Sequence, residues 1–250
     1  MIDPAMKLIL IQSGITLFII GCILKNSFSF QPLAFTCNNY ILNSYLYILF
    51  SFCVMLLAIF INDKFPFMPQ QKILKIAVMI GSFVLLVSIF LLSSKFILVK
   101  HGLWILLLLA YAYLLVPLYK THKQLFFKIG LQTISILVMF SLLAYFMKDK
   151  IQNSWGTYLR MGLFAVIVAS VIELIINYFH KKKSPDTPPP KHWKWLSYVS
   201  IGLFILYTIY DTKQILTLSQ QCKNPDYIKQ SMDIVLDGLN LFTNLYRSQS

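Results

Sequence analysis

The 250-residue chain is too apolar for a soluble protein: 58% of its residues are hydrophobic and 12% are charged, whereas soluble domains carry about 25% charged residues. The apolar residues fall into runs of about 17 to 23, the length that crosses the hydrocarbon core of a bilayer. This composition excludes a cytosolic enzyme, a secreted disulfide scaffold and a disordered tail. It predicts an all-α integral membrane protein whose helices contact the lipid bilayer.

Hydropathy predicts eight helical segments along the chain. They are residues 7–24, 43–62, 76–94, 102–119, 126–147, 157–179, 195–218 and 228–246. The last is the weakest membrane span, because Asp233, Asp237, Asn240 and Asn244 interrupt it. The alternative count is seven membrane helices, if one segment is re-entrant or lies at the membrane interface. No ten-residue segments of alternating polarity occur, which excludes a membrane β-barrel.

Two connections are longer than the others. The first, residues 25–42, is polar and aromatic and contains Cys37. The second, residues 181–194, is basic and rich in proline, so it cannot be helical throughout. This second connection predicts a six-helix membrane body at residues 1–180, followed by a C-terminal helical hairpin at residues 195–250.

The distribution of Lys and Arg predicts the orientation. With eight spans, the side that holds both termini carries thirteen of the 22 Lys and Arg residues. We therefore expect both termini in the cytoplasm. The net charge of +13 then reflects topology and attraction to anionic lipid, and we expect no nucleic-acid partner. The sequence indicates neither a protein partner nor an oligomeric state.

The chemical inventory disfavours an enzyme. The chain contains no zinc-protease, serine-hydrolase or nucleotide-binding motif, and its four histidines are expected in loops. The four cysteines show no CxxC spacing. Cys37 and Cys222 fall on the same, non-cytoplasmic side, where a disulfide is allowed, but two free thiols are expected. We predict no enzymatic activity and no cofactor, apart from Ca²⁺ as a permeant or bound ion.

An ionisable residue at membrane depth is a functional candidate by default. Glu173 lies near a helix end, and we expect it to reach the interface. Asp211 and Asp237 lie about 13 residues on either side of a turn near residues 223–225. At 1.5 Å per residue, an antiparallel hairpin puts both carboxylates at the same depth, roughly 18–20 Å from the turn.

Two facing carboxylates in a low dielectric cannot both ionise cheaply, so they would share a proton, with one apparent pKa raised toward neutrality. Such a pair predicts a pH sensor and ion gate, or a site for a hard cation such as Ca²⁺. Polar side chains share the faces of these two helices: Tyr207, Tyr210 and Gln214 on the first, and Asp233, Asn240 and Asn244 on the second. The alternative is a hydrogen-bonded pair that only locks the hairpin.

The C-terminal hairpin resembles the transmembrane Bax inhibitor motif (Bax inhibitor and Lifeguard) family. Tyr210-Asp211-Thr212 followed by Gln214-Ile215 is similar to the family's Tyr-Asp-Thr-Gln signature. A second stretch, Asp226-Tyr227-Ile228 with Leu236-Asp237 and Asn240-Leu241-Phe242, is similar to another family motif. Weaker markers are Phe65-Pro66 and Ser154-Trp155-Gly156.

The resemblance implies a Bax-inhibitor-like helical bundle in which Asp211 and Asp237 form a pH-sensitive latch over a calcium leak pathway. It also implies suppression of apoptosis through lowered store calcium. The membrane would be that of the endoplasmic reticulum, Golgi or virion for a eukaryotic or viral member, and the plasma membrane for a bacterial one. Three features depart from the family: Lys213 replaces a glutamine, Gly238 replaces a branched residue, and no arginine precedes Arg160. The alternative function is therefore a non-conducting scaffold or viral membrane component.

Overall fold

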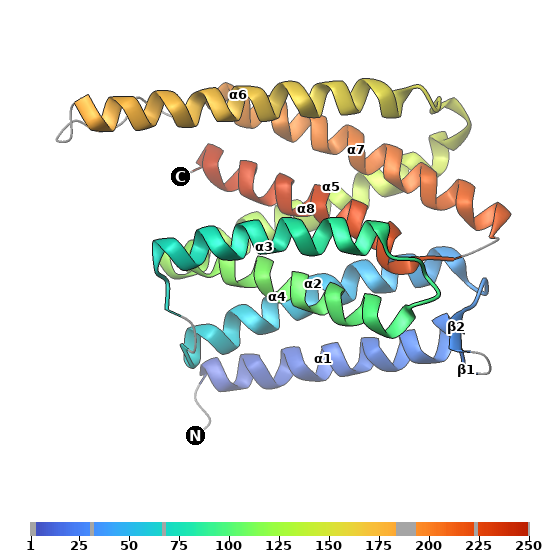
Figure 1. The fold of residues 1–250 in the computed structure, drawn as a ribbon. Coiled ribbons are helices and arrows are strands. Elements are labelled where there is room, and N and C mark those ends of the chain that lie inside the picture. The colour runs from blue at the N-terminus through green and yellow to red at the C-terminus, as the bar shows by residue number, and fades with distance from the viewer. Residues whose placement is uncertain (1–3, 31–32, 67–68, 184–193, 223–224, 250) are drawn as a thin grey trace. The chain divides into compact units, whose positions relative to one another are not determined.

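The computed structural model describes residues 4–30, 33–66, 69–183, 194–222 and 225–249 (Figure 1). Within these ranges the chain forms eight α-helices, one short 3-10 turn and a two-stranded hairpin. The helices are α1 (Pro4–Ser27), α2 (Tyr40–Lys64), α3 (Lys72–Leu91), α4 (Ile97–Thr121), α5 (Lys123–Met147), α6 (Trp155–Lys183), α7 (Lys194–Gln221) and α8 (Tyr227–Gln249). The strands are β1 (Phe28–Phe30) and β2 (Leu33–Phe35).

The predicted fold class is confirmed. Each of the eight predicted segments corresponds to one helix, and helices α1 to α6 are long and apolar enough to cross a membrane. Large apolar side chains point outward from these helices; Phe18, Leu91 and Phe146 are each at least 74% exposed. A soluble protein does not tolerate such an apolar exterior, so these side chains face lipid.

Contacts divide the chain into two compact units. The first unit comprises residues 1–124 and 217–235, and the second comprises residues 125–216 and 236–250. The division that the linker predicts, at residues 181–194, stays a prediction, and residues 184–193 of that loop lie outside the described ranges.

The first unit is built from helices packed side by side. Helix α1 packs along α2, α2 along α4, and α4 along α3. The connection after α1 forms the β1–β2 hairpin, in which Phe28 pairs with Phe35. This hairpin brings Phe35 against Tyr227 at the start of α8, with ring centroids 5.1 Å apart.

His101 belongs to this aromatic region and not to a loop, because α4 begins four residues before it. Its Nδ1 lies 2.7 Å from the carbonyl oxygen of Ile97 and therefore donates. In the neutral ring, Nε2 then accepts from the hydroxyl of Tyr47 at 2.9 Å. The expectation of a loop histidine was wrong because hydropathy started this helix too late.

The second unit has its own apolar cluster. Ala144, Ile151 and Ile209 are buried together, and Trp155 and Tyr210 pack against them. Glu173 of α6 is buried in this unit and accepts a hydrogen bond from Arg247 Nη2 at 3.2 Å. The expectation that Glu173 reaches the interface was wrong, because Arg247 in the last turn of α8 supplies a cationic partner, without which burying a carboxylate is costly.

Candidate functional site

Asp211 and Asp237 occupy equivalent positions on their helices. Asp211 lies ten residues before the end of α7 at Gln221, and Asp237 lies ten residues after the start of α8 at Tyr227. At 1.5 Å per residue, each carboxylate is about 15 Å from its end of the hairpin. Helix α8 continues without interruption through Gly238, so this glycine does not break the helix that carries Asp237.

The side chain of Tyr207 lies within electrostatic range of both acids. Tyr207 precedes Asp211 by one helical turn, and its hydroxyl interacts electrostatically with the carboxylates of both Asp211 and Asp237. Asp237 is only 4% exposed, and Asp211 is half-buried. The Tyr207 hydroxyl is itself buried and has no hydrogen-bond partner among the described residues. The second unit therefore places a buried hydroxyl within electrostatic reach of two carboxylates.

Arg160 adds a positive charge to this group. Its guanidinium also acts on the Tyr207 hydroxyl, and its Nε donates to the carbonyl oxygen of Gly156 at 3.0 Å. From the sequence, Arg160 reads as an interfacial anchor because it begins an apolar span. The fold instead places its charge within electrostatic range of Tyr207.

Two sequence markers meet beside the acids. Gly156 of α6 lies against the Tyr210 ring so closely that a Cβ at this position would be 2.7 Å from the ring carbon Cζ. Two residues after Tyr210 in α7, Thr212 Oγ1 shares a 3.1 Å hydrogen bond with Ser141 Oγ of α5. The Tyr-Asp-Thr sequence thus fixes α7 against α6 through Tyr210 and against α5 through Thr212, and Asp211 lies between these two contacts.

Lys213, two residues after Asp211, has a hydrogen-bond partner. Its ammonium donates to the side-chain carbonyl of Asn153, in the turn that precedes α6. The contact explains how a lysine is accommodated where the family has a glutamine.

The remaining polar residues of the predicted face have other partners. Asn240 and Asn244 each donate to a backbone carbonyl four residues earlier in α8, at 2.8 Å. Asp233 belongs to the first unit, where it interacts with Lys229 and Asp226. Tyr210 packs in the apolar cluster, and Gln214 is half-buried. Asp233, Asn240 and Asn244 therefore lie on one face of α8, but their surroundings differ.

A resident metal site does not form in the described part of the chain. Nowhere in it do three or more His, Cys, Asp or Glu side chains come close enough to hold a metal ion. Ca²⁺ takes six to eight oxygen ligands, and Asp211 and Asp237 supply two carboxylates.

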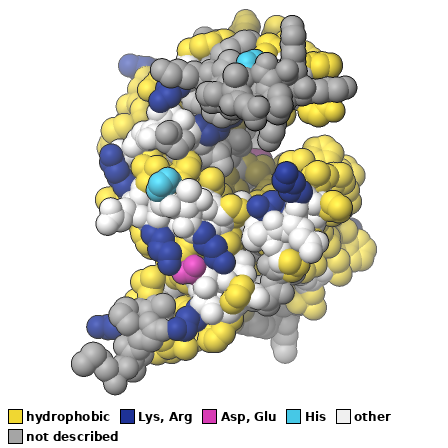
Figure 2. All heavy atoms as spheres, turned by 90° about the vertical axis from the view of Figure 1, so that its left-hand side faces the viewer, with side chains coloured by type: hydrophobic (Ala, Val, Ile, Leu, Met, Phe, Trp, Pro, Cys, Tyr) yellow, Lys and Arg dark blue, Asp and Glu magenta, His cyan; other side chains and the backbone are white. Residues whose placement is uncertain are grey.

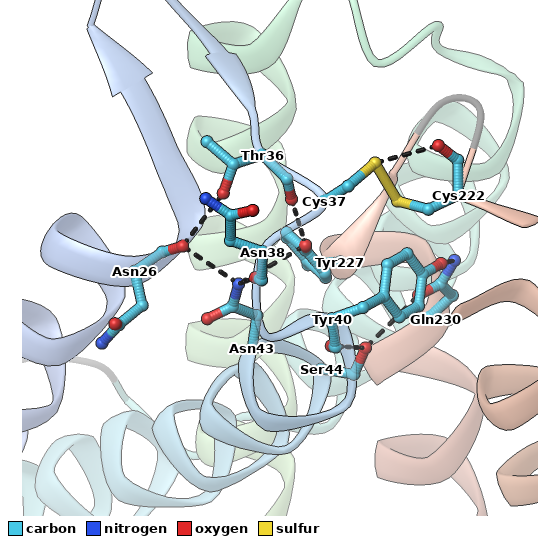
Figure 3. The surroundings of a disulfide bond; sticks show 10 residues. All are labelled: Asn26, Thr36, Cys37, Asn38, Tyr40, Asn43, Ser44, Cys222, Tyr227 and Gln230. Atoms are coloured by element: carbon cyan, nitrogen blue, oxygen red, sulfur yellow. Dashed lines mark hydrogen bonds between the residues drawn. A yellow bond between two sulfur atoms is a disulfide. The ribbon is translucent and has the colours of Figure 1, made fainter. Parts of the chain in front are cut away.

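A disulfide joins the segment between β2 and α2 to the residue that follows α7. Cys37 and Cys222 are bonded, with their Cα atoms 5.9 Å apart (Figure 3). The expectation of two free thiols was wrong, because membrane topology places both residues on one side but does not give their distance. Hydrogen bonds on both sides of Cys37 hold it close to Cys222. The Tyr227 hydroxyl donates to the carbonyl oxygen of Thr36, and Asn43 Nδ2 donates to the carbonyl oxygen of Asn38 at 2.8 Å.

A buried ion pair lies at the same end of the first unit. The Lys100 side chain is 1% exposed, and its Nζ donates to Asp226 Oδ2 at 2.5 Å and to the carbonyl oxygen of Leu92 at 2.9 Å. Asp226 Oδ1 accepts from the backbone N–H of Lys229 at 3.1 Å, which caps the first turn of α8. Asp226 thereby links α4 to α8.

The opposite end of the first unit is basic. Helix ends there carry Lys7, Lys64, Lys72, Lys75, Lys120 and Lys123. Among the residues that the structure describes at this end, Asp63 is the acidic one, and it accepts from Lys123 Nζ at 2.7 Å. Figure 2 shows basic side chains gathered around one acidic side chain on this face. The first unit thus has a lysine-rich end and a disulfide-bonded end.

One protein family matches the chain over most of its length. The sequence model of a family described as inhibitor of apoptosis-promoting Bax1 matches residues 37–248. The match includes both helices of the C-terminal hairpin and both cysteines of the disulfide, and it leaves out helix α1 and the β1–β2 hairpin. No curated protein matches the chain.

Proposed function

Since this chain belongs to the Bax inhibitor family of membrane proteins, we propose that it is a pH-sensitive calcium leak channel without enzymatic activity. Asp211 and Asp237 form its gate. In a cell the channel lowers the calcium content of a store and thereby suppresses cell death.

The grouping of charges around Tyr207 carries this proposal. A buried hydroxyl that interacts with two carboxylates and one guanidinium is a place where a proton changes the local charge strongly. Two nearby acids in a low dielectric lose their protons in two coupled steps. When Asp211 and Asp237 lose the second proton, the pair carries two negative charges instead of one. The added charge lowers the energy barrier for a cation to pass and increases the repulsion between α7 and α8. Conduction therefore depends on pH.

The two ends of the first unit support an orientation. Lysine-rich ends of membrane proteins face the cytoplasm, and disulfides persist in oxidising compartments. The lysine-rich end around Asp63 and the Cys37–Cys222 bond lie at opposite ends of the same helices. We therefore orient the N-terminus to the cytoplasm and the disulfide to the lumen of a secretory organelle or to the cell exterior.

Substitution of the two acids tests the gate. Purified protein in dye-loaded liposomes should pass Ca²⁺, and Asp211→Asn, Asp237→Asn and the double variant should alter both the rate and its pH dependence. Asp63→Asn is the matched control, because Asp63 forms a partly exposed ion pair at the lysine-rich end. Unchanged flux and pH dependence in the double variant would refute the gate.

A non-conducting scaffold is the second candidate. The fixed contacts of Tyr210 with Gly156 and of Thr212 with Ser141 favour it, since they hold α7 rigidly. In that case folded protein passes no more Ca²⁺ than empty liposomes, and the acid pair serves as a structural lock.

A further inference from the structure

An apolar cavity lies among α2, α3 and α4 of the first unit. Its volume is about 270 Å³, and it is lined by Ala58 and Asn62 of α2, Val78 of α3, and Leu106, Leu109 and Tyr113 of α4, together with two alanines of α4. None of these described lining residues is charged. An apolar cavity does not hold water well, so its natural occupant is a hydrocarbon.

Asn62 is the exception in this apolar wall. The residue is 3% exposed, and its Oδ1 has no hydrogen-bond partner within the part of the chain that the structure describes. A buried polar atom without a partner is destabilising. The Tyr113 hydroxyl cannot donate to it, because its proton already goes to the carbonyl oxygen of Pro69 at 2.8 Å. The Asn62 amide turns about a soft χ2 torsion, so a ligand in the cavity can reach it.

The cavity runs inward from the lysine-rich end. Asn62 lies two residues before the end of α2, whereas Tyr113 and Leu106 lie eight and fifteen residues before the end of α4 at the same end. At 1.5 Å per residue, the lining spans depths from about 3 Å to about 22 Å. Leu106 and Leu109 are 55% and 43% exposed on the lipid-facing surface. The polar group is thus at the shallow end, and the rim opens toward the hydrocarbon core.

We propose that this cavity binds one uncharged, single-chain membrane amphiphile that carries a hydroxyl group. The hydroxyl pairs with the Asn62 amide near the membrane surface, and the alkyl chain follows α4 inward past Leu109. At ~30 Å³ for each non-hydrogen atom, the cavity holds about nine of them, which fits part of one alkyl chain and not a second chain. The neutral lining disfavours a phosphate or ammonium headgroup, because an ion there would lose its hydration without a counter-charge.

Photolabelling of the full chain in phosphatidylcholine nanodiscs tests this site. The probe is a medium-chain saturated primary alcohol with a diazirine in its chain, and the comparison probe is the alkane in which a methyl group replaces the hydroxyl. We expect the alcohol to label peptides containing Val78 and Leu109 about fivefold more than the alkane at equal membrane concentration, the preference that one net hydrogen bond confers.

Two variants distinguish the contribution of the Asn62 hydrogen bond from that of the cavity volume. Asn62→Leu should abolish the preference for the alcohol while retaining labelling by the alkane, and Ala110→Phe, which fills the cavity, should reduce labelling by both probes. Ala77→Phe is the matched control, because Ala77 is exposed on α3 and does not line the cavity; it should change neither.

Three results would overturn the proposal. These are equal labelling of the wild type by alcohol and alkane, labelling that persists in Ala110→Phe, and competition by a sterol but not by the unlabelled alcohol. The comparison of the two probes on wild-type protein needs no variant, so it remains decisive even if Asn62→Leu fails to fold. Because the measurement is binding and not ion flux, its outcome is independent of the proposed channel activity.

Discussion

Asp226→Asn should destabilise the protein by about 3 kcal/mol, the lower part of the range for breaking a buried ion pair. The substitution keeps the size of the side chain and the oxygen that caps α8, and it replaces the negatively charged oxygen opposite Lys100 by an amide nitrogen that cannot accept a hydrogen bond. The Lys100 ammonium is left 1% exposed, with the carbonyl oxygen of Leu92 as its remaining hydrogen-bond acceptor. The lower value is appropriate because Asp226 itself is 18% exposed.

Three further variants isolate this effect. Asp226→Ala also removes the cap of α8 and should cost about 1 kcal/mol more. Lys100→Met combined with Asp226→Asn should recover most of the stability, because no unpaired charge stays buried. Asp63→Asn at the partly exposed pair with Lys123, whose side chains are 23% and 53% exposed, should cost no more than about 1 kcal/mol.

The assay is reversible unfolding in mixed micelles, followed by tryptophan fluorescence, with midpoints compared among the four variants. Trp104 lies in α4 close to Lys100 and is buried, so its emission reports on this end of the first unit. Equal destabilisation by Asp226→Asn and Asp63→Asn would refute the argument that burial makes the Lys100 pair important. A double variant no more stable than Asp226→Asn alone would refute the role of the unpaired lysine.

The disulfide and the close packing of Tyr210 give two more predictions. Alkylation of unfolded but unreduced protein should modify Cys22 and Cys53 and leave Cys37 and Cys222 protected; modification of all four thiols before reduction contradicts this. Replacement of Cys37 and Cys222 by serine should lower stability by at most about 5 kcal/mol, the chain-entropy limit for a separation of 185 residues. Gly156→Ala should cost about 1–3 kcal/mol through overpacking against the Tyr210 ring, whereas Gly102→Ala, which has open space around its Cβ position, should cost little. Equal effects of the two glycine substitutions would contradict the close contact.

The sequence predicts the helices well, because a membrane span requires a long apolar run and little else. All eight predicted segments correspond to helices, including the polar α8, whose regular spacing of Asp and Asn marks one helical face. The equal spacing of Asp211 and Asp237 from the hairpin turn also follows from the sequence, since the helical rise is constant.

Contacts between distant segments were beyond the reach of the sequence. Lys100 and Asp226 are 126 residues apart, and hydropathy places both at the edges of spans, where solvation is the default. The disulfide depends on the β1–β2 hairpin, which periodicity does not predict in strands of three residues. Arg160 resembles an anchor until the fold brings its charge to Tyr207. In each case the missing information is a tertiary distance.

The most direct test of the central claim is Ca²⁺ flux into dye-loaded liposomes that contain this chain, measured at about pH 6 and about pH 8, which bracket the titration of a coupled acid pair. We expect a flux above that of empty liposomes, a rate that differs between the two pH values, and loss of that difference in Asp237→Asn. Folded protein that passes no Ca²⁺ at either pH would contradict the channel, and a pH-dependent flux unaffected by Asp237→Asn would contradict the assignment of its gate.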